Sequence, residues 1–254
     1  GAKDFVRVVP MPDKFKGEHI SENLKFEKYY IDKVKRLIAN IQNRGKQLAL
    51  FIVEPILGCG GQVTLPNFFL KESFKAVKKA GGLCIVDEVQ IGFGRLGSHF
   101  WGFEMSNVEP DIITLGKSIG NGHPLSVTIT RKDIANFFNN GMEYFNSFGG
   151  NPVSCAVGQA VLDVIKDEDL QSNAFEVGSY LFQGLLTLKN KYEIIGDVRG
   201  RGLFLGIELI QKSNQMISAS AAARTAINLM RDKNILLSTD GPDNNVIKIK
   251  PPLV

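Results

Sequence analysis

The chain has 254 residues, of which 44% are hydrophobic and 22% are charged, and its net charge is +4. This balance excludes a disordered tail, and the length is enough to bury a large core. Lysine and arginine are scattered among acidic residues, so the sequence does not favour nucleic-acid binding. No apolar run has the length of a membrane span, and GAKDFVRVVP has no signal-peptide core. We therefore expect a soluble protein that binds neither nucleic acid nor a membrane.

Cysteine and histidine spacing indicates neither a disulfide framework nor a metal site. Cys59, Cys84 and Cys155 are odd in number, lie far apart and form no C-x-x-C pair. This pattern predicts reduced thiols in the cytoplasm, with the mitochondrial matrix as the alternative and any targeting segment outside this chain. The three histidines also lack ligand spacing, so no metal site is predicted.

The first half of the chain alternates helical and strand patterns. Apolar residues at helical spacing predict helices over about 20–44 and 66–81, the second ending at a glycine pair. Compact apolar runs predict strands at 48–54 and 83–89, and two more follow at 111–116 and 125–131. Apolar strands interleaved with helices predict an α/β fold with a mostly parallel sheet flanked by helices. Ligands of such sheets bind beyond the carboxyl ends of the strands.

The second half predicts further α/β structure. Helices are expected at about 151–166, 176–188 and 219–233, and strands at 202–210 and 246–250. We expect a large domain over 1–184 and part of a smaller C-terminal α/β domain over 185–254.

Two charged residues follow neighbouring predicted strands. The strand from Leu83 continues into Asp87, and the strand from Asp111 ends in Gly116-Lys117. By themselves, Asp87 and Lys117 are better explained by a plain ion pair at the edge of the sheet, because such pairs are common. The functional interpretation is that a lysine amine forms an imine with an aldehyde cofactor, while the carboxylate keeps a pyridine nitrogen protonated.

The sequence around these residues favours the functional interpretation. Four motifs occur in order: IVDEVQIGFGRLG, PDIITLGKSIGNGHPL, FNSFGGNPVSCA and GDVRGRGLFLGIEL. Together they resemble class III aminotransferases, which have the type I fold of pyridoxal-phosphate enzymes. The similarity runs from about Leu48 to Leu209 and is weaker over nearly all the rest.

The resemblance implies pyridoxal 5'-phosphate as cofactor and assigns residues to it. Lys117 corresponds to the lysine that carries the cofactor as a Schiff base, and Asp87 to the acid beside the pyridine nitrogen. Val89 is expected to pack on one ring face and Gln90 to reach the ring hydroxyl. Ser147 stands where the family usually has threonine, whose hydroxyl binds the cofactor phosphate across a subunit interface. A homodimer with shared active sites is therefore implied.

Two more residues are assigned through the resemblance. Arg199 in VRGRG matches an arginine that grips the substrate's carboxylate, a task suited to a planar bidentate donor. Its alternative is an ordinary salt-bridge residue. Glu54 ends the first predicted strand and is expected to support the cofactor site by orienting Gln90.

The same residues serve two reactions. The first is transfer of an amino group from a primary amine to a keto acid. The second is elimination of phosphate and ammonia, because GCGGQ and LLSTDGPDNNVIKIKPP are most similar to ethanolamine-phosphate and phosphohydroxylysine phospho-lyases. GSHFWGF instead resembles alanine-glyoxylate aminotransferases. Cys59 also stands where many relatives carry an acid after EPI-x-G, which would leave an arginine such as Arg199 available for a carboxylate or a phosphate.

A function other than catalysis is the remaining alternative. The chain is shorter than the family, and it lacks the segments expected to supply the phosphate loop and the aromatic residue stacked on the ring. An inactive fragment or an interaction module is therefore the alternative to an enzyme.

Overall fold

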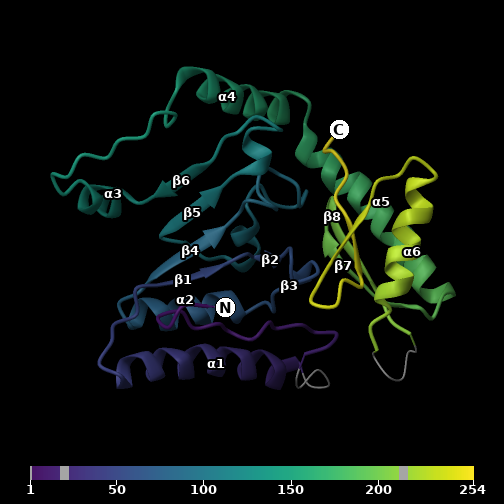
Figure 1. Cartoon of the computed structure of the whole chain (residues 1–254), viewed down its shortest axis with the longest axis horizontal. Coiled ribbons are helices and arrows are strands. Elements are labelled where there is room, and N and C mark those ends of the chain that lie inside the picture. The colour runs from purple at the N-terminus through teal and green to yellow at the C-terminus, as the bar shows by residue number, and fades with distance from the viewer. Residues whose placement is uncertain (1, 18–22, 212–216) are drawn as a thin grey trace.

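The structure, a computed structural model, describes residues 2–17, 23–211 and 217–254. Two four-stranded sheets and one short hairpin form its framework, with helices packed against both sheets (Figure 1). Within the described residues, no helix is long and apolar enough to span a membrane. The same residues contain no cluster of three or more His, Cys, Asp or Glu side chains arranged for a metal ion.

The first sheet has the strand order β1-β4-β5-β6. Its strands are β1 (Leu50–Val53), β4 (Leu83–Asp87), β5 (Ile112–Leu115) and β6 (Val127–Thr130). β1, β4 and β5 are parallel, as predicted, whereas β6 runs antiparallel to β5. A parallel partner requires a long crossover, and the link between β5 and β6 contains only the short 3-10 helix η2 (Lys117–Ile119).

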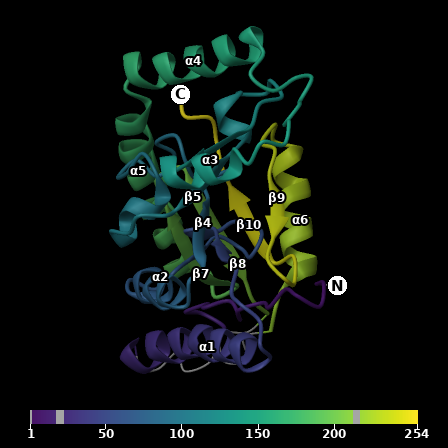
Figure 2. The same cartoon turned by 90° about the vertical axis from the view of Figure 1, so that its left-hand side faces the viewer.

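Two helices cover one face of this sheet. α1 (Asn23–Asn43) and α2 (Phe69–Lys79) lie on the same side of it, which Figure 2 shows from a second direction. Their buried side chains form one core with Cys84 and Val86 of β4. On β1, by contrast, Leu50 and Ile52 are 45% and 54% exposed, so this strand has one open face in the described chain.

The link after the first sheet departs from the prediction. α3 (Lys132–Phe138) was not predicted, whereas α4 (Pro152–Asp167) closely matches the helix expected at 151–166. Asn151 caps α4 because its side chain accepts the backbone N–H of Ser154, and Pro152 stands at the first helical position. Between α3 and α4 the chain extends away from the sheet (Figure 1).

The second sheet is antiparallel and has the order β7-β8-β10-β9. Its strands are β7 (Ile195–Arg201), β8 (Phe204–Leu209), β9 (Ser238–Asp240) and β10 (Val246–Ile249). α5 (Leu170–Lys191) and α6 (Ser220–Arg231) pack against it. The predicted boundary between residues 184 and 185 falls inside α5, and the division into two domains stays a prediction.

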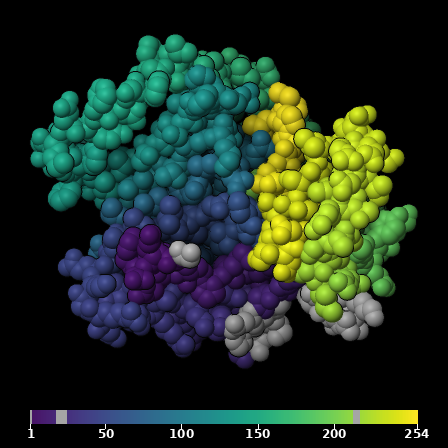
Figure 3. Space-filling view, in the orientation of Figure 1, coloured from purple at the N-terminus to yellow at the C-terminus, as the bar shows by residue number. Residues whose placement is uncertain are grey.

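A short hairpin that follows β1 in the chain packs against the second sheet. It consists of β2 (Ile56–Leu57) and β3 (Val63–Thr64), and β3 packs against β7. Its loop also meets the second sheet, because the carbonyl of Cys59 accepts the backbone N–H of Gly241 at 3.1 Å. In Figure 3 the C-terminal segment, in yellow, lies directly against the first half of the chain. The end of the first sheet is therefore lined by residues of both sheets.

Candidate active site

The predicted acid and lysine stand at equivalent ends of adjacent strands. Asp87 is the last residue of β4 and pairs in register with Thr114 of β5. Lys117 follows Thr114 by three residues and is the first residue of η2. Because β4 and β5 are parallel, both side chains belong to the carboxyl edge of the sheet, where ligands of such sheets bind.

Asp87 is half-buried and only partly satisfied. Its Oδ1 accepts the backbone N–H of Val89 at 3.0 Å. No further hydrogen bond to this carboxylate is found in the described part of the chain, so Oδ2 is available. The buried hydroxyl of Thr114, its register partner, also has no hydrogen-bond partner among the described residues. Of the two groups, only the Asp87 carboxylate is partly exposed, since the Thr114 hydroxyl is buried.

Lys117 has an unusual backbone conformation. Its φ of 41° lies in the left-handed region, which costs a non-glycine residue about 1–3 kcal/mol. Such strain persists where the surrounding structure fixes the residue, and it is common at active sites. The side chain is exposed, so the amine is accessible to a ligand at the carboxyl edge.

The charges of Asp87 and Lys117 both act on the pKa of Glu54. Burial raises the pKa of its carboxyl, and the nearby Asp87 raises it further. The backbone N–H of Gly58, 3.1 Å from Oε2, lowers this pKa, as do the positive charges of Lys250 and Lys117. One carboxyl group therefore experiences both predicted site residues and a second lysine. We call Glu54, Asp87, Gln90, Lys117 and Lys250 the strand-end cluster.

Gln90 is held by a residue that the sequence did not reveal. Nζ of Lys250 donates to Oε1 of Gln90 at 2.7 Å, which directs the amide nitrogen toward Sγ of Cys59, 3.7 Å away. A Cβ atom on Gly58 would stand 2.5 Å from this nitrogen and 3.1 Å from Oε2 of Glu54. Glycine at position 58 thus lets Gln90 and Glu54 approach, but the described hydrogen bond that orients Gln90 comes from Lys250.

The signal for Lys250 was present in the sequence. VIKIK places Lys248 and Lys250 two residues apart, and strand periodicity directs two such side chains to the same side. What the sequence cannot show is that this side faces Gln90, 160 residues earlier. Lys250 follows β10 of the second sheet and Gln90 follows β4 of the first, so their contact joins the two sheets.

Glu88 points away from the site although it follows Asp87 directly. It is 1% exposed and accepts the backbone N–H groups of Gly102 and Phe103, each at 2.9 Å. Burial raises the pKa of its carboxyl to about 7, against the lowering by these two hydrogen bonds. Glu88 therefore anchors the segment 102–106 and belongs to the fold.

Ser147 lies apart from the other predicted residues. It is exposed on the segment between α3 and α4 that extends from the body of the molecule (Figure 1). Three aromatic residues of this segment share the exposure: Tyr144 at 72%, Phe145 at 78% and Phe148 at 84%. Phe137 of α3 is also 89% exposed. Within one chain the structure does not bring Ser147 to Lys117.

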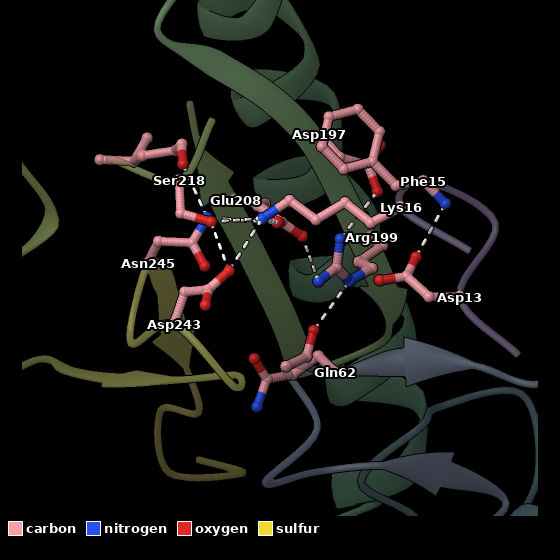
Figure 4. A network of polar contacts seen from close by, with 12 residues as sticks. Asp13, Phe15, Lys16, Gln62, Asp197, Arg199, Glu208, Ser218, Asp243 and Asn245 are labelled. Atoms are coloured by element: carbon pink, nitrogen blue, oxygen red, sulfur yellow. Dashed lines mark hydrogen bonds and ion pairs between the residues drawn. The ribbon is translucent and has the colours of Figure 1, made fainter. Parts of the chain in front are cut away.

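Arg199 lies in a network of paired charges shown in Figure 4. Its guanidinium donates to the carbonyl of Gly61 at 2.7 Å and pairs with Asp197 at 3.1 Å and Glu208 at 2.7 Å. Lys16, from the N-terminal segment, pairs with the same Glu208 at 2.5 Å and with Asp243 at 3.5 Å. We call Lys16, Asp197, Arg199, Glu208 and Asp243 the Arg199 network.

The charges of this network stabilise each other. Burial works against the charge of Arg199, but Glu208, Asp13 and Asp197 keep its pKa above the ordinary value. Burial likewise disfavours ionised Glu208, yet Lys16 and Arg199 hold the pKa of its carboxyl below the usual range. A substrate carboxylate that reaches Arg199 must therefore compete with two anions already in place.

Comparison with known proteins assigns the family. The model of the class III aminotransferases matches residues 3–254. An "Alanine--glyoxylate aminotransferase 2-like" protein of Drosophila melanogaster is 44% identical, with 98% of this chain and 52% of the relative covered. "Ethanolamine-phosphate phospho-lyase homolog 1" of Caenorhabditis elegans is 41% identical, over 98% of this chain and 56% of the relative. The chain belongs to the class III aminotransferase family.

A solved structure agrees with this assignment. A phospholyase from Arthrobacter, in complex with phosphoethanolamine, superimposes with a TM-score of 0.94 at 37% identity. The similarity covers 99% of this chain and 59% of the phospholyase. The predicted type I fold is thereby confirmed. The chain spans about half the length of the curated relatives it matches.

Proposed function

We propose that the protein is a pyridoxal-phosphate enzyme that acts on a primary amine through Lys117 and transfers the amino group to a keto acid. The observation that carries this proposal is the placement of Asp87 and Lys117 at the ends of adjacent parallel strands. The charges of both residues shift the pKa of the Glu54 carboxyl, in opposite directions. The family of the chain supports the same chemistry.

The residues of the strand-end cluster fit this cofactor. A half-buried carboxylate with a free oxygen suits a protonated pyridine nitrogen, and an exposed amine suits an aldehyde. Val89, half-buried and two residues beyond Asp87, offers an apolar surface to a ring. Gln90 offers an amide nitrogen to a ring hydroxyl, because Lys250 occupies its oxygen.

In this proposal each group has a distinct task. The bound cofactor supplies an electron sink for the electron pair left when a proton leaves the amine-bearing carbon of the substrate. The carboxylate of Asp87 keeps the ring nitrogen protonated, which maintains the sink. Lys117 would hold the cofactor in the resting state, and its amine, freed when the substrate amine takes its place, would accept the proton from the amine-bearing carbon. Glu54 stabilises the positive charges beside it.

A second candidate function is a phospho-lyase that eliminates phosphate and ammonia from phosphoethanolamine or phosphohydroxylysine. It is favoured by the similarity to the phospholyase solved with phosphoethanolamine and by Cys59, which leaves no acid beside Gln90 at that position. Elimination needs the same acid and the same lysine, so the strand-end cluster alone does not separate the two reactions.

The two reactions are separated by their products. The longest expressible form of the protein, supplied with pyridoxal phosphate, is given phosphoethanolamine or phosphohydroxylysine with and without pyruvate or 2-oxoglutarate. Amino transfer that requires the keto acid and releases no phosphate supports the aminotransferase. Phosphate release without a keto acid supports the lyase. The absence of both products and of near-visible absorbance would favour the inactive fragment or interaction module.

We further propose that the active form is a homodimer with shared sites. The exposed aromatic side chains near Ser147 in the sequence support it, since exposed apolar side chains in number are typical of a protein interface. Ser147 would then bind the cofactor phosphate of the partner subunit, which explains its separation from Lys117 within one chain.

Mixed dimers test this arrangement. Lys117→Ala and Ser147→Asp chains, each inactive alone, are unfolded together and refolded. Shared sites require mixed dimers to regain one intact site, or roughly a quarter of wild-type activity in the whole sample. Activity that stays absent in mixed dimers of normal stability would rule out sharing through Ser147.

The remaining proposals concern compartment and Arg199. Three free cysteines, two of them exposed, support a reducing compartment such as the cytoplasm. Cell fractionation tests this against the mitochondrial matrix. For Arg199, binding of a substrate carboxylate stays a proposal from the resemblance, and it requires the pairs with Asp197 and Glu208 to open.

A further inference from the structure

We propose that Lys250 is a positioning residue whose charge decides which end of the Gln90 amide faces the cofactor. While charged, the ammonium holds the amide nitrogen toward the ring oxygen of the cofactor, and when neutral it allows the amide to reverse. This inference rests on the proposed function, in which Gln90 bonds to the ring hydroxyl. It adds a control on that hydrogen bond and requires no contact between Lys250 and the substrate.

The contact between Lys250 and Gln90 permits one arrangement of the amide. Nζ of Lys250 lies 2.7 Å from Oε1 of Gln90. An ammonium has three donors and no acceptor, so it can bond only to the amide oxygen. The amide nitrogen is thereby directed elsewhere, and its one contact in the described chain is Sγ of Cys59 at 3.7 Å. Because a thiol sulfur is a weak acceptor, the nitrogen keeps a donor for a ligand.

Packing limits the movement of the Gln90 amide. A Cβ atom built on Gly58 would lie 2.5 Å from Nε2 and 2.9 Å from Cδ of Gln90, so the amide lies directly against the backbone of Gly58. Oε2 of Glu54 accepts the N–H of Gly58 at 3.1 Å and holds this backbone. The amide cannot shift toward Gly58, whereas a half-turn about its last torsion exchanges oxygen and nitrogen within the same space.

Lys250 has no better acceptor than Gln90 among the described residues. Its side chain is 18% exposed, and the one carboxylate within 4.0 Å of Nζ in that part of the chain is Asp240. Oδ2 of Asp240, at 4.0 Å, already accepts the side-chain amide of Gln62 at 2.9 Å. Oδ1 of Asp240 accepts Nζ of Lys248 at 3.1 Å. The ammonium of Lys250 is therefore directed to the Gln90 oxygen.

The charge of Lys250 is lost at moderately alkaline pH. Burial, with a smaller contribution from the like charge of Lys248, lowers the pKa of its amine to about 8. The surrounding groups Asp240, Cys59 and Glu54 raise this pKa without restoring the ordinary value of 10.5. The contact with Gln90 thus changes its chemistry within a pH range in which the protein can be studied.

The two orientations of the Gln90 amide have opposite effects on a cofactor. A neutral amine has a lone pair, so above about pH 8 Lys250 can accept the N–H of Gln90. The amide oxygen then faces the ring oxygen of the cofactor, and two acceptors leave each other without a partner. A donor in this place instead stabilises the ring oxygen, most strongly when that oxygen is ionised. Affinity for the cofactor ring should therefore be higher while Lys250 is charged.

The first measurement is made without cofactor. The side-chain N–H signals of Gln90, assigned in nitrogen-15 NMR spectra by their loss in Gln90→Glu, should shift with pH around a midpoint of about 8. This shift should be absent in Lys250→Met. Lys248→Met is the matched control, because Lys248 bonds to Asp240 and its charge only lowers the pKa of Lys250. It should retain the shift with a higher midpoint.

The second measurement concerns the cofactor ring. The analogue 4'-deoxypyridoxine 5'-phosphate has the ring hydroxyl but no aldehyde, so calorimetry measures its affinity without a covalent bond to Lys117. Lys250→Met should bind it about tenfold more weakly than the wild-type protein at pH 7. Lys250→Arg stays charged, so it should keep the wild-type affinity at pH 7. It should also remove an approximately tenfold loss that the wild-type protein shows between pH 7 and about 9.5.

The outcomes separate this proposal from the proposed function. Gln90 signals that do not respond to pH in the unmodified protein would overturn the proposal, even where Lys250→Met does not fold. So would an equal response in folded Lys250→Met, or an equal pH dependence of analogue binding in wild-type protein and Lys250→Arg. A normal Gln90 response with no analogue binding at any pH, and no reducible attachment of pyridoxal phosphate to Lys117, would instead overturn the proposed function.

Discussion

The strand-end cluster and the Arg199 network contain similar groups in opposite states. In the Arg199 network both cations have a carboxylate within 2.7 Å, and the buried Glu208 is paired on two sides. In the strand-end cluster Lys117 is exposed, Asp87 has one free oxygen, and Lys250 is 4.0 Å from its nearest described carboxylate. Removing one partner of a buried ion pair is destabilising, whereas incompletely paired charges in partly buried positions are typical of functional sites. The comparison thus distinguishes a set of fully paired charges from a set that a ligand would complete.

The largest effect on stability is expected at the centre of the Arg199 network. Arg199→Ala leaves the buried Glu208 and the half-buried Asp197 with one partner fewer each, which costs about 3 kcal/mol in free energy of unfolding. Urea denaturation measures it, with Arg231→Ala, at an exposed pair with Asp232, as the matched control. If Arg199→Ala kept its stability and only raised the KM for a carboxylate substrate, the substrate-binding assignment would hold and the contrast would fail.

A comparable effect, on turnover alone, is expected at Asp87. Asp87→Asn removes the charge that would keep the cofactor nitrogen protonated, so kcat should fall about 10²- to 10³-fold. Stability should change little, because the Asp87 carboxylate has a single backbone hydrogen bond in the described chain. Steady-state kinetics and a thermal melt of the same sample give both values. Unaltered turnover would remove Asp87 from the site.

The third prediction concerns Glu88, which follows Asp87 directly but is expected to affect stability and not catalysis. Its pKa in the folded protein, about 7, lies above its ordinary value of 4.5, so the folded state binds the proton more tightly. This contribution to stability is complete below pH 4.5 and is lost as the pH rises through 7, up to about 3 kcal/mol. Glu88→Gln should flatten that part of the stability-pH curve while leaving the pH dependence of kcat unchanged. A changed kcat profile would place Glu88 among the functional groups.

The smallest effect is expected at the rim of the Arg199 network. Asp243 is 54% exposed and lies 3.5 Å from Lys16, so Asp243→Asn should cost less than about 1 kcal/mol. Its pKa is lowered first by the hydroxyl of Ser218 and then by Lys16. The difference in unfolding free energy should shrink further in 0.5 M salt. A loss as large as that of Arg199→Ala would mean that the network is equally cooperative throughout.

The sequence predicted most of the first sheet and the two residues at its edge. Apolar periodicity located β4 and β5, and the rule for parallel sheets then placed Asp87 and Lys117 together. The apolar pattern did not predict strands whose sequence is polar or glycine-rich. β7 reads IGDVRGR and β9 reads STD, and both are stabilised by neighbouring strands instead of an apolar pattern of their own.

The missing parts of the site depend on long-range contacts. Lys250 reaches Gln90 across the two sheets, and the pairing of Arg199 depends on Glu208 of the neighbouring strand. A sequence motif supplied Arg199 with a function but could not show that its charge was already compensated. In the same way, the resemblance predicts that Glu54 orients Gln90. In the structure the side chain of Gln90 accepts a hydrogen bond from Lys250.

The most direct test of the account is the covalent attachment of the cofactor. The protein is incubated with pyridoxal phosphate, reduced with borohydride and digested, and the modified peptide is identified by mass spectrometry. We predict one cofactor per chain, on the peptide that contains Lys117, and none at that stoichiometry in Lys117→Ala. Lys250 is the strongest competitor, because its pKa of about 8 makes its amine more reactive than an ordinary lysine. Attachment at Lys250, or unchanged trapping in Lys117→Ala, would contradict the account.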